Sequence, residues 1–429
     1  MYQASILINS LILIFLFCDF RRTKSYSIFS PFFSYAIFHL IVFIVRPIYI
    51  YLNNKNMVFE YMKIIPNEFD LVFSQVLTII SLFCFYIGYK IFSRTGLPIN
   101  FKYKLNYFSK RQFFITFILL APIILYSHYL LINQMIGNNL VEMEFVNYTP
   151  ININFSGYIV DSQYLILGIL FLMVYVFDFN KISIMIAIFY ICFRLAVGYS
   201  RWTIIVLVFS LVLLYCYRNR AYFLNYRYSI LGFTLLFLFS LIGGNRRFIL
   251  NFFLEESAIQ AASDESNIFD KIFDSLDFGN FDFLVYLAKA IPDRTLTYSY
   301  GFQYLQAFTE PIPRVLWPDK PAGVFYGFDL NDYGNFIALT TGIVGDGWIS
   351  FGIFGVILVS LIWGSILGKL YYYFINVNYK NFYLIYIPIY SLTLLFYRDG
   401  NIVPALKFIL YFTLPIYLTI IIRKFSFTK

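Results

Sequence analysis

Long apolar stretches separated by short polar segments dominate the sequence. A helix needs about 20 mostly apolar residues to cross a bilayer. Eleven stretches approach or exceed that length: 4–20, 27–51, 71–92, 113–133, 158–179, 182–198, 202–217, 229–244, 342–370, 382–397 and 402–422. The sixth, seventh, eighth and tenth are near the lower limit of length. The pattern predicts an all-α polytopic integral membrane protein with about 11 transmembrane helices, within a range of ten to twelve.

The composition agrees with this fold class. Of the 429 residues, 60% are hydrophobic and 13% are charged, whereas soluble domains contain about 25% charged residues. A water-soluble surface needs more charge than this, so a soluble enzyme, a nucleic-acid-binding protein and a disordered chain are excluded. The four cysteines and two histidines lie in apolar runs, so we expect no disulfide framework, no metal site and no cofactor.

Lysine and arginine are shared unevenly between the two sets of loops. One set contains most of them, whereas the short loops of the other set contain only Lys55, Lys63, Arg201 and Arg398. Loops rich in these residues stay in the cytoplasm, so the N-terminus is expected outside and the C-terminus inside. Residues 1–244 then form helices one to eight, 245–341 form one large external loop, and 342–429 form helices nine to eleven.

Two segments of the external loop stand out. The segment from Phe281 to Ile291 has the apolar spacing of a helix, and we expect it to lie on the membrane surface. The run 310–321 contains four prolines, which exclude a helix or a central strand and stiffen the backbone. A stiff segment with charged and aromatic side chains is typical of a pre-organised site, here with Glu310, Arg314, Trp317 and Lys320. The alternative is a rigid cap over the helices.

Basic residues gather at the same external face: Arg201, Arg246, Arg247, Arg314, Lys320 and Arg398. Arg194, seven positions before Arg201, can share a helix face with it. Guanidinium groups bind phosphate oxygens in pairs of hydrogen bonds, so these residues are predicted to bind a lipid-linked diphosphate. The alternative is pairing with nearby acids, such as Asp399 for Arg398. For Arg46, inside the second stretch, we expect the side chain to snorkel to the interface.

Asp346 lies between two glycines at the outer mouth of the ninth stretch. Glycine allows a ligand to approach the backbone closely, and a carboxylate at this place can act as a general base for a sugar hydroxyl. The alternative is an acid that binds the free amides at the start of a helix.

Three short motifs, together with the number of spans and the late external loop, resemble the bacterial O-antigen polymerases, which join oligosaccharide repeat units. The motifs are Pro311-Ile312-Pro313-Arg314-x-Leu316-Trp317-Pro318-x-Lys320-Pro321, Gly198-Tyr199-Ser200-Arg201, and Gly345-Asp346-Gly347 followed by Phe351-Gly352-x-x-Gly355.

The resemblance implies an inverting, metal-independent glycosyltransferase at the periplasmic face of the inner membrane of a Gram-negative bacterium. Such an enzyme moves a growing glycan from undecaprenyl diphosphate to the non-reducing end of a new lipid-linked repeat unit. A separate co-polymerase protein sets the chain length. The expected partners are thus the lipid-linked donor and acceptor glycans, the co-polymerase and the bilayer, but no nucleic acid.

Joining the resemblance to the residue pattern assigns roles. Arg201, Arg314 and Arg398 bind the diphosphate and stabilise its charge as it leaves, with Arg194, Arg246 and Arg247 as further binding residues. Asp346 or Glu310 takes the proton from the attacking hydroxyl. Lys320 binds phosphate and Trp317 binds sugar.

Two other functions remain open. An O-antigen ligase shares the architecture, but ligases resemble one another in using an external-loop histidine, and residues 245–341 contain none. A lipid-linked oligosaccharide flippase is disfavoured because flippases tend to have internal repeats, an even number of spans and little external mass.

Overall fold

The computed structural model describes most of the predicted spans and part of the long connection. The described residues are 1–23, 26–53, 66–93, 108–135, 143–146, 149–152, 157–196, 201–223, 278–293, 295–309, 312, 316–317, 340–376, 382–400 and 402–426.

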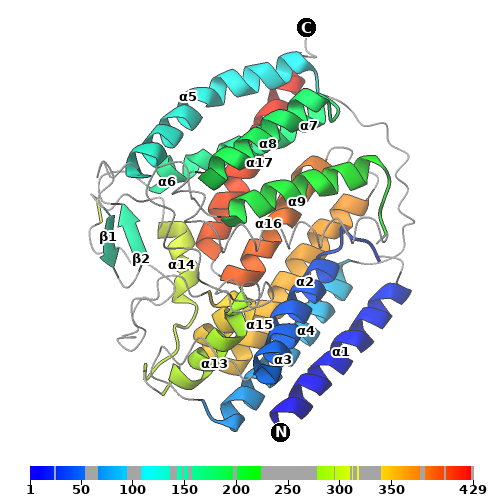
Figure 1. The fold of residues 1–429 in the computed structure, drawn as a ribbon, viewed down its shortest axis with the longest axis vertical. Coiled ribbons are helices and arrows are strands. Elements are labelled where there is room, and N and C mark those ends of the chain that lie inside the picture. The colour runs from blue at the N-terminus through cyan, green and yellow to red at the C-terminus, as the bar shows by residue number, and fades with distance from the viewer. Residues whose placement is uncertain are drawn as a thin grey trace.

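Within these residues the fold is helical except for one small antiparallel hairpin, β1 (Met143–Val146) with β2 (Thr149–Asn152) (Figure 1). The first half contains α1 (Tyr2–Arg22), α2 (Pro31–His39), the π-helix η1 (Leu40–Val45), α3 (Arg46–Leu52), α4 (Glu68–Phe92), α5 (Lys110–Met135), α6 (Gly157–Asp161), the 3₁₀ turn η3 (Ser162–Tyr164), α7 (Leu165–Val176), α8 (Lys181–Ala196) and α9 (Arg201–Arg218). The second half contains α13 (Asn280–Ala290), α14 (Phe302–Thr309), α15 (Gly342–Ile375), α16 (Tyr383–Asp399) and α17 (Ile402–Ser426).

In the described part of the chain, seven helical segments are long and apolar enough to cross a bilayer: Tyr2–Arg22, Pro31–Leu52, Glu68–Phe92, Lys110–Asn133, Tyr158–Val176, Gly342–Ile375 and Ile402–Phe425. The protein is therefore a helical polytopic membrane protein, as predicted. The shorter helices α8, α9 and α16 coincide with three more predicted spans. The predicted span 229–244 lies outside the described residues, so the count of eleven stays a prediction.

Helices α1 and α4 run in the relative direction that the predicted alternation requires. The N-terminal ammonium of Met1 lies 2.6 Å from Glu68 at the start of α4, and Lys90 at the end of α4 lies 2.7 Å from Asp19 near the end of α1. These two ion pairs make α1 and α4 parallel, as expected for the first and third spans. Which side of the membrane each end occupies stays a prediction.

Glycines bring α4 and α15 into backbone contact. A Cβ added at Gly364 would lie 2.2 Å from the carbonyl oxygen of Phe85, and one at Gly368 would lie 2.8 Å from that of Tyr89. Gly364 and Gly368 form the small-x-x-x-small pattern with which membrane helices pack closely. Gly88 of α4 meets Leu361 in the same way, so the contact depends on glycine in both helices.

The substitution Gly364→Val should destabilise the protein by about 1–3 kcal/mol or more, the typical range for overpacking, because its Cβ would meet backbone rather than a movable side chain. Thermal unfolding of the detergent-solubilised protein measures this effect. The control is Ile362→Phe, which adds bulk on an exposed face of the same helix. Equal midpoints for Gly364→Val and the native protein would show that the two helices do not pack this closely.

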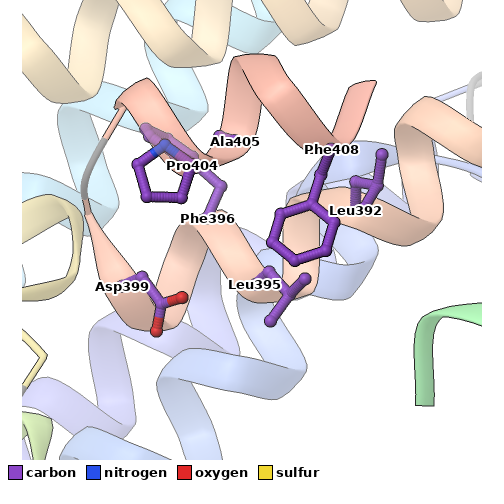
Figure 2. Close-up of a pocket in the computed structure, with 7 residues that line it drawn as sticks. All are labelled: Leu392, Leu395, Phe396, Asp399, Pro404, Ala405 and Phe408. Carbon is purple, nitrogen blue, oxygen red and sulfur yellow. The ribbon is translucent and has the colours of Figure 1, made fainter. Parts of the chain in front are cut away.

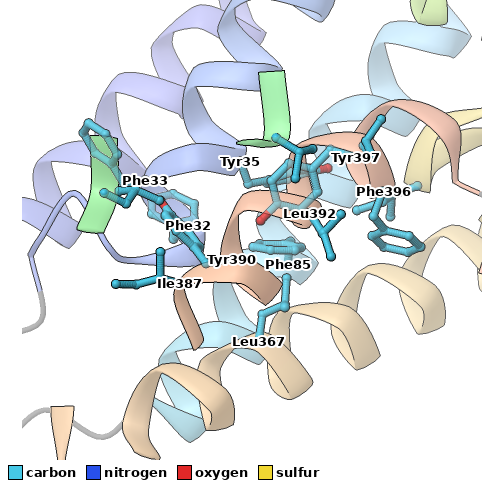
Figure 3. Packing of buried hydrophobic residues seen from close by; sticks show 14 of the residues in the cluster. Phe32, Phe33, Tyr35, Phe85, Leu367, Ile387, Tyr390, Leu392, Phe396 and Tyr397 are labelled. Atoms are coloured by element: carbon cyan, nitrogen blue, oxygen red, sulfur yellow. The ribbon is translucent and has the colours of Figure 1, made fainter. Parts of the chain in front are cut away.

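Tyrosines of α16 fix the start of α2. Tyr386 donates to the carbonyl of Phe29 (2.6 Å), Tyr390 to that of Ile28 (2.8 Å) and Tyr397 to that of Pro31 (3.2 Å). Figure 3 shows this cluster, in which rings of α2 and α16 pack with Phe85 of α4 and Leu367 of α15. Backbone carbonyls at the start of α2 thus accept hydrogen bonds from protein side chains, without water. The tyrosines of α16 therefore have a structural role.

The segment predicted to lie on the membrane surface is instead a core element. Helix α13 covers Phe281 to Ala290, and Phe281, Leu284 and Leu287 are completely buried. Asp282 on the same helix forms an ion pair with Arg46 (Nη2 to Oδ2, 2.8 Å), with both side chains at most 2% exposed. The predictions of a surface helix and of a snorkelling Arg46 are therefore both wrong. The apolar face of α13 is buried in the protein, and the charge of Arg46 pairs with Asp282 of that helix.

The ninth predicted span is not one straight helix. Within α15, Phe351 and Gly352 have non-helical dihedral angles (φ −150° and +60°), which only glycine adopts easily at the second position. A Cβ at Gly355 would lie 1.9 Å from the carbonyl oxygen of Gly347. Residues this far apart touch only where the chain bends sharply, so the short helix 342–350 lies against the start of the long helix 353–375.

Candidate functional site

Asp346 lies at the centre of a buried polar network between the short helix 342–350 and α14. It is 0% exposed. Its Oδ1 accepts a hydrogen bond from Nε2 of Gln303 (3.2 Å) and its Oδ2 accepts one from the hydroxyl of Tyr304. Gln303 also donates to the hydroxyl of Ser350 (2.7 Å). The carboxylate thus binds side chains of α14 and not, as the alternative interpretation proposed, the free amides of its own helix.

Burial and the neighbouring Asp346 carboxylate raise the pKa of the Tyr304 phenol well above its ordinary value. Tyr304 therefore stays neutral at physiological pH, and its hydroxyl donates a hydrogen bond to the carboxylate. Asp346 and Tyr304 together tie α14 to the short helix, and α14 ends at Thr309, directly before the proline-rich run that begins at Glu310. The network therefore holds α14, the last described helix before that run, against the short helix.

The segment before α14 caps the C-terminal end of the short helix. The amides of Ser299 and Tyr300 donate to the carbonyls of Ile349 (2.9 Å) and Ser350 (3.0 Å) at its C-terminal end. Trp348 in turn donates through its indole nitrogen to the carbonyl of Ile291 after α13 (3.1 Å). Because carbonyls freed by a helix break must be satisfied within a membrane protein, these contacts explain how the break at Phe351 is tolerated.

The start of the short helix is bonded to the end of α16, where Arg398 lies. The side-chain amide of Asn280 donates to the backbone carbonyl of Arg398 (2.6 Å), and the hydroxyl of Thr341 donates to the backbone carbonyl of Asp399 (2.9 Å). Gly400 ends α16 in the left-handed conformation (φ +70°), and a Cβ there would lie 2.3 Å from the carbonyl oxygen of Gly342. Elements α13, α15 and α16 therefore meet at one point.

The guanidinium of Arg398 lies between an acid and an aromatic ring. Its Nη1 is 3.0 Å from Asp399, and its central carbon is 4.6 Å from the centre of the Trp202 ring in the first turn of α9. Stacking on an aromatic face orients a planar guanidinium. The predicted pairing of Arg398 with Asp399 is thus present, together with a contact that the sequence did not indicate.

Arg194 of α8 reaches the same turn of α9. Its side chain is buried and donates to Gln163 (2.6 Å) and to the hydroxyl of Thr203 (3.5 Å). Lys407, another basic residue inside a predicted span, forms an ion pair with Asp161 (3.2 Å), two residues before Gln163. Arginines from α8 and α16 therefore flank Trp202 and Thr203 at the N-terminal end of α9, where the helix dipole also favours an anion.

A small pocket opens beside this place, between α16 and α17 (Figure 2). Asp399 lies at its polar end, and the remaining walls are apolar: Leu392, Leu395, Phe396, Pro404, Ala405 and Phe408. The pocket is thus amphipathic, with its charged end next to Arg398.

The structure brings together only some of the predicted site residues. Arg194, Arg398 and the backbone of Arg201 meet at the start of α9, and Asp346 lies on the helix bonded to the end of α16. Trp317 is among the described residues, and its side chain is 39% exposed. The other predicted residues lie outside the described residues: Arg246, Arg247, Glu310, Arg314 and Lys320.

Four side chains at the site were not predicted: Trp202, Asn280, Gln303 and Tyr304. Trp202 follows Arg201 directly, so an aromatic ring beside a predicted phosphate-binding arginine was a usable signal. Asn280, Gln303 and Tyr304 lie in an external segment where polar and aromatic residues are common, and only the folded chain shows that they bind α15 and α16.

Comparison with known proteins adds no relative. No protein-family model matches this chain, and no curated protein and no solved structure is significantly similar to it.

Proposed function

We propose that the protein is an O-antigen polymerase, a glycosyltransferase that joins undecaprenyl-diphosphate-linked repeat units at the periplasmic face of the inner membrane. The observation that carries the proposal is the convergence of Arg194 and Arg398 on the first turn of α9. The end of α16 is hydrogen-bonded to α13, which belongs to the predicted external loop. A lipid-linked diphosphate at the membrane surface would meet these groups while its lipid chain stays in the bilayer.

In the proposed reaction, a hydroxyl oxygen of the acceptor sugar attacks C1 of the first sugar of the donor glycan. The bond from C1 to the diphosphate oxygen breaks, and undecaprenyl diphosphate leaves with the electron pair. Arg201, Arg314 and Arg398 stabilise the charge of this leaving group, which is the largest electrostatic demand of the step. A carboxylate takes the hydroxyl proton, and no metal ion is required.

We assign the base role to Glu310 and a positioning role to Asp346. A general base must reach the proton that it removes, and Asp346 is enclosed with both oxygens already accepting hydrogen bonds. Glu310 directly follows α14, the helix that Asp346 holds. Arg246, Arg247 and Lys320 keep their proposed phosphate-binding role, and Trp317 is proposed to stack on sugar.

Substitutions at Asp346 distinguish positioning from base chemistry. Asp346→Asn keeps one acceptor for Tyr304 and should retain measurable polymer formation. Asp346→Ala leaves the Tyr304 hydroxyl without its Asp346 acceptor, costs about 1–3 kcal/mol for that buried group, and should abolish polymer. The readout is polymer length and amount at matched protein level. If Asn and Ala are equally inactive while both proteins fold, Asp346 is the base.

A flippase is the main rival, since broken helices are typical of transporter sites. In such sites the carbonyls freed at the break coordinate the transported ion or substrate. Here the carbonyls of Ile349 and Ser350 accept hydrogen bonds from Ser299 and Tyr300, so this feature favours a fixed structural role for the break. A ligase shares the proposed diphosphate chemistry and differs only in its acceptor.

The lipopolysaccharide ladder of a strain in which this gene is deleted tests the proposal. A polymerase predicts loss of the ladder with one band of core plus a single repeat unit, because units are still made, flipped and ligated. Loss of that band as well would instead indicate a flippase or a ligase. Accumulation of lipid-linked polymer would single out the ligase, and an unchanged ladder would reject all three functions.

A further inference from the structure

Helix α14 has an apolar face that turns away from the protein. Phe302, Leu305 and Phe308 are spaced three residues apart, and all three are exposed, Phe308 by 80%. The opposite face contains the buried Gln303 and the Tyr304 that binds Asp346. The usual arrangement of a surface helix is therefore reversed, with polar groups inside and large apolar groups outside.

This face continues an apolar surface that belongs to the bilayer. Along α15, exposed apolar side chains recur every four residues at Phe354, Leu358, Ile362 and Ile366, on a helix long and apolar enough to cross a membrane. The exposed Phe351 begins this row, and its ring lies 6.0 Å from that of Tyr300, two residues before α14.

We propose that α14 lies in the bilayer interface, with Phe302, Leu305 and Phe308 inserted among the lipid acyl chains on the same side as the start of α15. The occupant is lipid, because Phe351, which begins the exposed apolar row of the membrane-spanning helix α15, contacts Tyr300 directly before α14, and because contiguous exposed apolar surface marks a membrane or protein contact. A helix of this kind is buried about 5–10 Å into the boundary between head groups and acyl chains.

The inference does not depend on the proposed function. Residues 281–291 were predicted to lie on the membrane surface, and that segment is buried as α13. The interfacial helix is instead α14, whose hydrogen bonds to Asp346 set its height relative to α15.

Depth measurement tests this proposal on the full chain reconstituted in vesicles of phosphatidylethanolamine and phosphatidylglycerol. An environment-sensitive fluorophore is attached to Phe308→Cys or Leu305→Cys after replacement of the four native cysteines. Phe354→Cys on α15 is the lipid control, and Asp293→Cys, at an exposed site between α13 and α14, is the aqueous control. Quenching is measured with iodide in water and with lipids that have a nitroxide on the head group or along the acyl chain.

The proposal predicts that labels at positions 305 and 308 resist iodide as the α15 control does. Nitroxide lipids should quench them, with a depth of about 5–10 Å. Iodide quenching equal to that at position 293 would overturn it. Protection from both iodide and nitroxide lipids would also overturn it, since a second copy or another protein would then cover this face.

A measurement on the native protein guards against a failure of the labelled variants to fold. A lipid with a photoreactive group in its acyl chain should cross-link to residues 302–309 as well as to the α15 row. Cross-linking to the α15 row without α14 would contradict the proposal.

Discussion

Asp282→Ala should destabilise the protein by about 3–5 kcal/mol, the range measured when one partner of a buried ion pair is removed. Arg46 is enclosed in the protein and binds Asp282 through Nη2 at 2.8 Å and Nε at 3.4 Å. Without the carboxylate, its charge would remain buried next to α13. The unfolding midpoint of the detergent-solubilised protein measures the loss.

Replacing both partners separates the buried charge from the packing of α13. The double variant Arg46→Met/Asp282→Leu should recover much of the lost stability, because an apolar pair of similar volume can replace a buried ion pair at little cost. Lys90→Ala is the matched control, since its ion pair with Asp19 is exposed and such pairs contribute about 0–1 kcal/mol. Equal stability of Asp282→Ala and Lys90→Ala would mean that water reaches Arg46.

Arg398→Ala should reduce polymer formation about 100-fold or more, the scale of losing one group that stabilises transition-state charge. Arg398→Lys should rescue little, because an ammonium cannot stack as a plane on Trp202 and bind Asp399 and a phosphate in the same geometry. Trp202→Leu should also reduce activity by releasing the guanidinium. Polymer is quantified at equal amounts of membrane-inserted protein.

Arg218→Ala is the control for this experiment. Arg218 lies at the other end of α9 and forms an ion pair with Asp178 (2.9 Å), so it shares the helix but not the site. Its loss should leave polymer formation unchanged. Native polymer levels in Arg398→Ala would remove Arg398 from the proposed diphosphate site and restrict its role to the pairing with Asp399.

Apolar length alone predicts most of the fold, because a bilayer admits few structures other than helices. Apolar length does not show whether an amphipathic helix lies on the membrane surface or inside the protein. The apolar spacing of Phe281 to Ile291 suits a membrane surface as well as a groove in the protein. The deciding feature is the partner of Asp282, which lies 236 residues away in the sequence.

Single residues were harder to place than spans for the same reason. Arg46 was expected to snorkel because the local sequence offers no acid, whereas folding supplies Asp282. The pair Phe351-Gly352 was noted as a motif, but the bend there follows from contact of Gly347 with Gly355 and from caps supplied by residues 299 and 300. The sequence could indicate that Arg194 and Arg398 lie near the start of α9, because the predicted topology places these short turns at one face.

The central claim is that this protein joins lipid-diphosphate-linked glycans. Its most direct test is to incubate the purified chain, reconstituted in phospholipid vesicles, with undecaprenyl-diphosphate-linked repeat units in the presence of a metal chelator. The account predicts a ladder of longer glycans and release of undecaprenyl diphosphate in proportion to the bonds formed, both lost in Arg398→Ala. Units that cross the bilayer without lengthening would contradict it and identify a flippase.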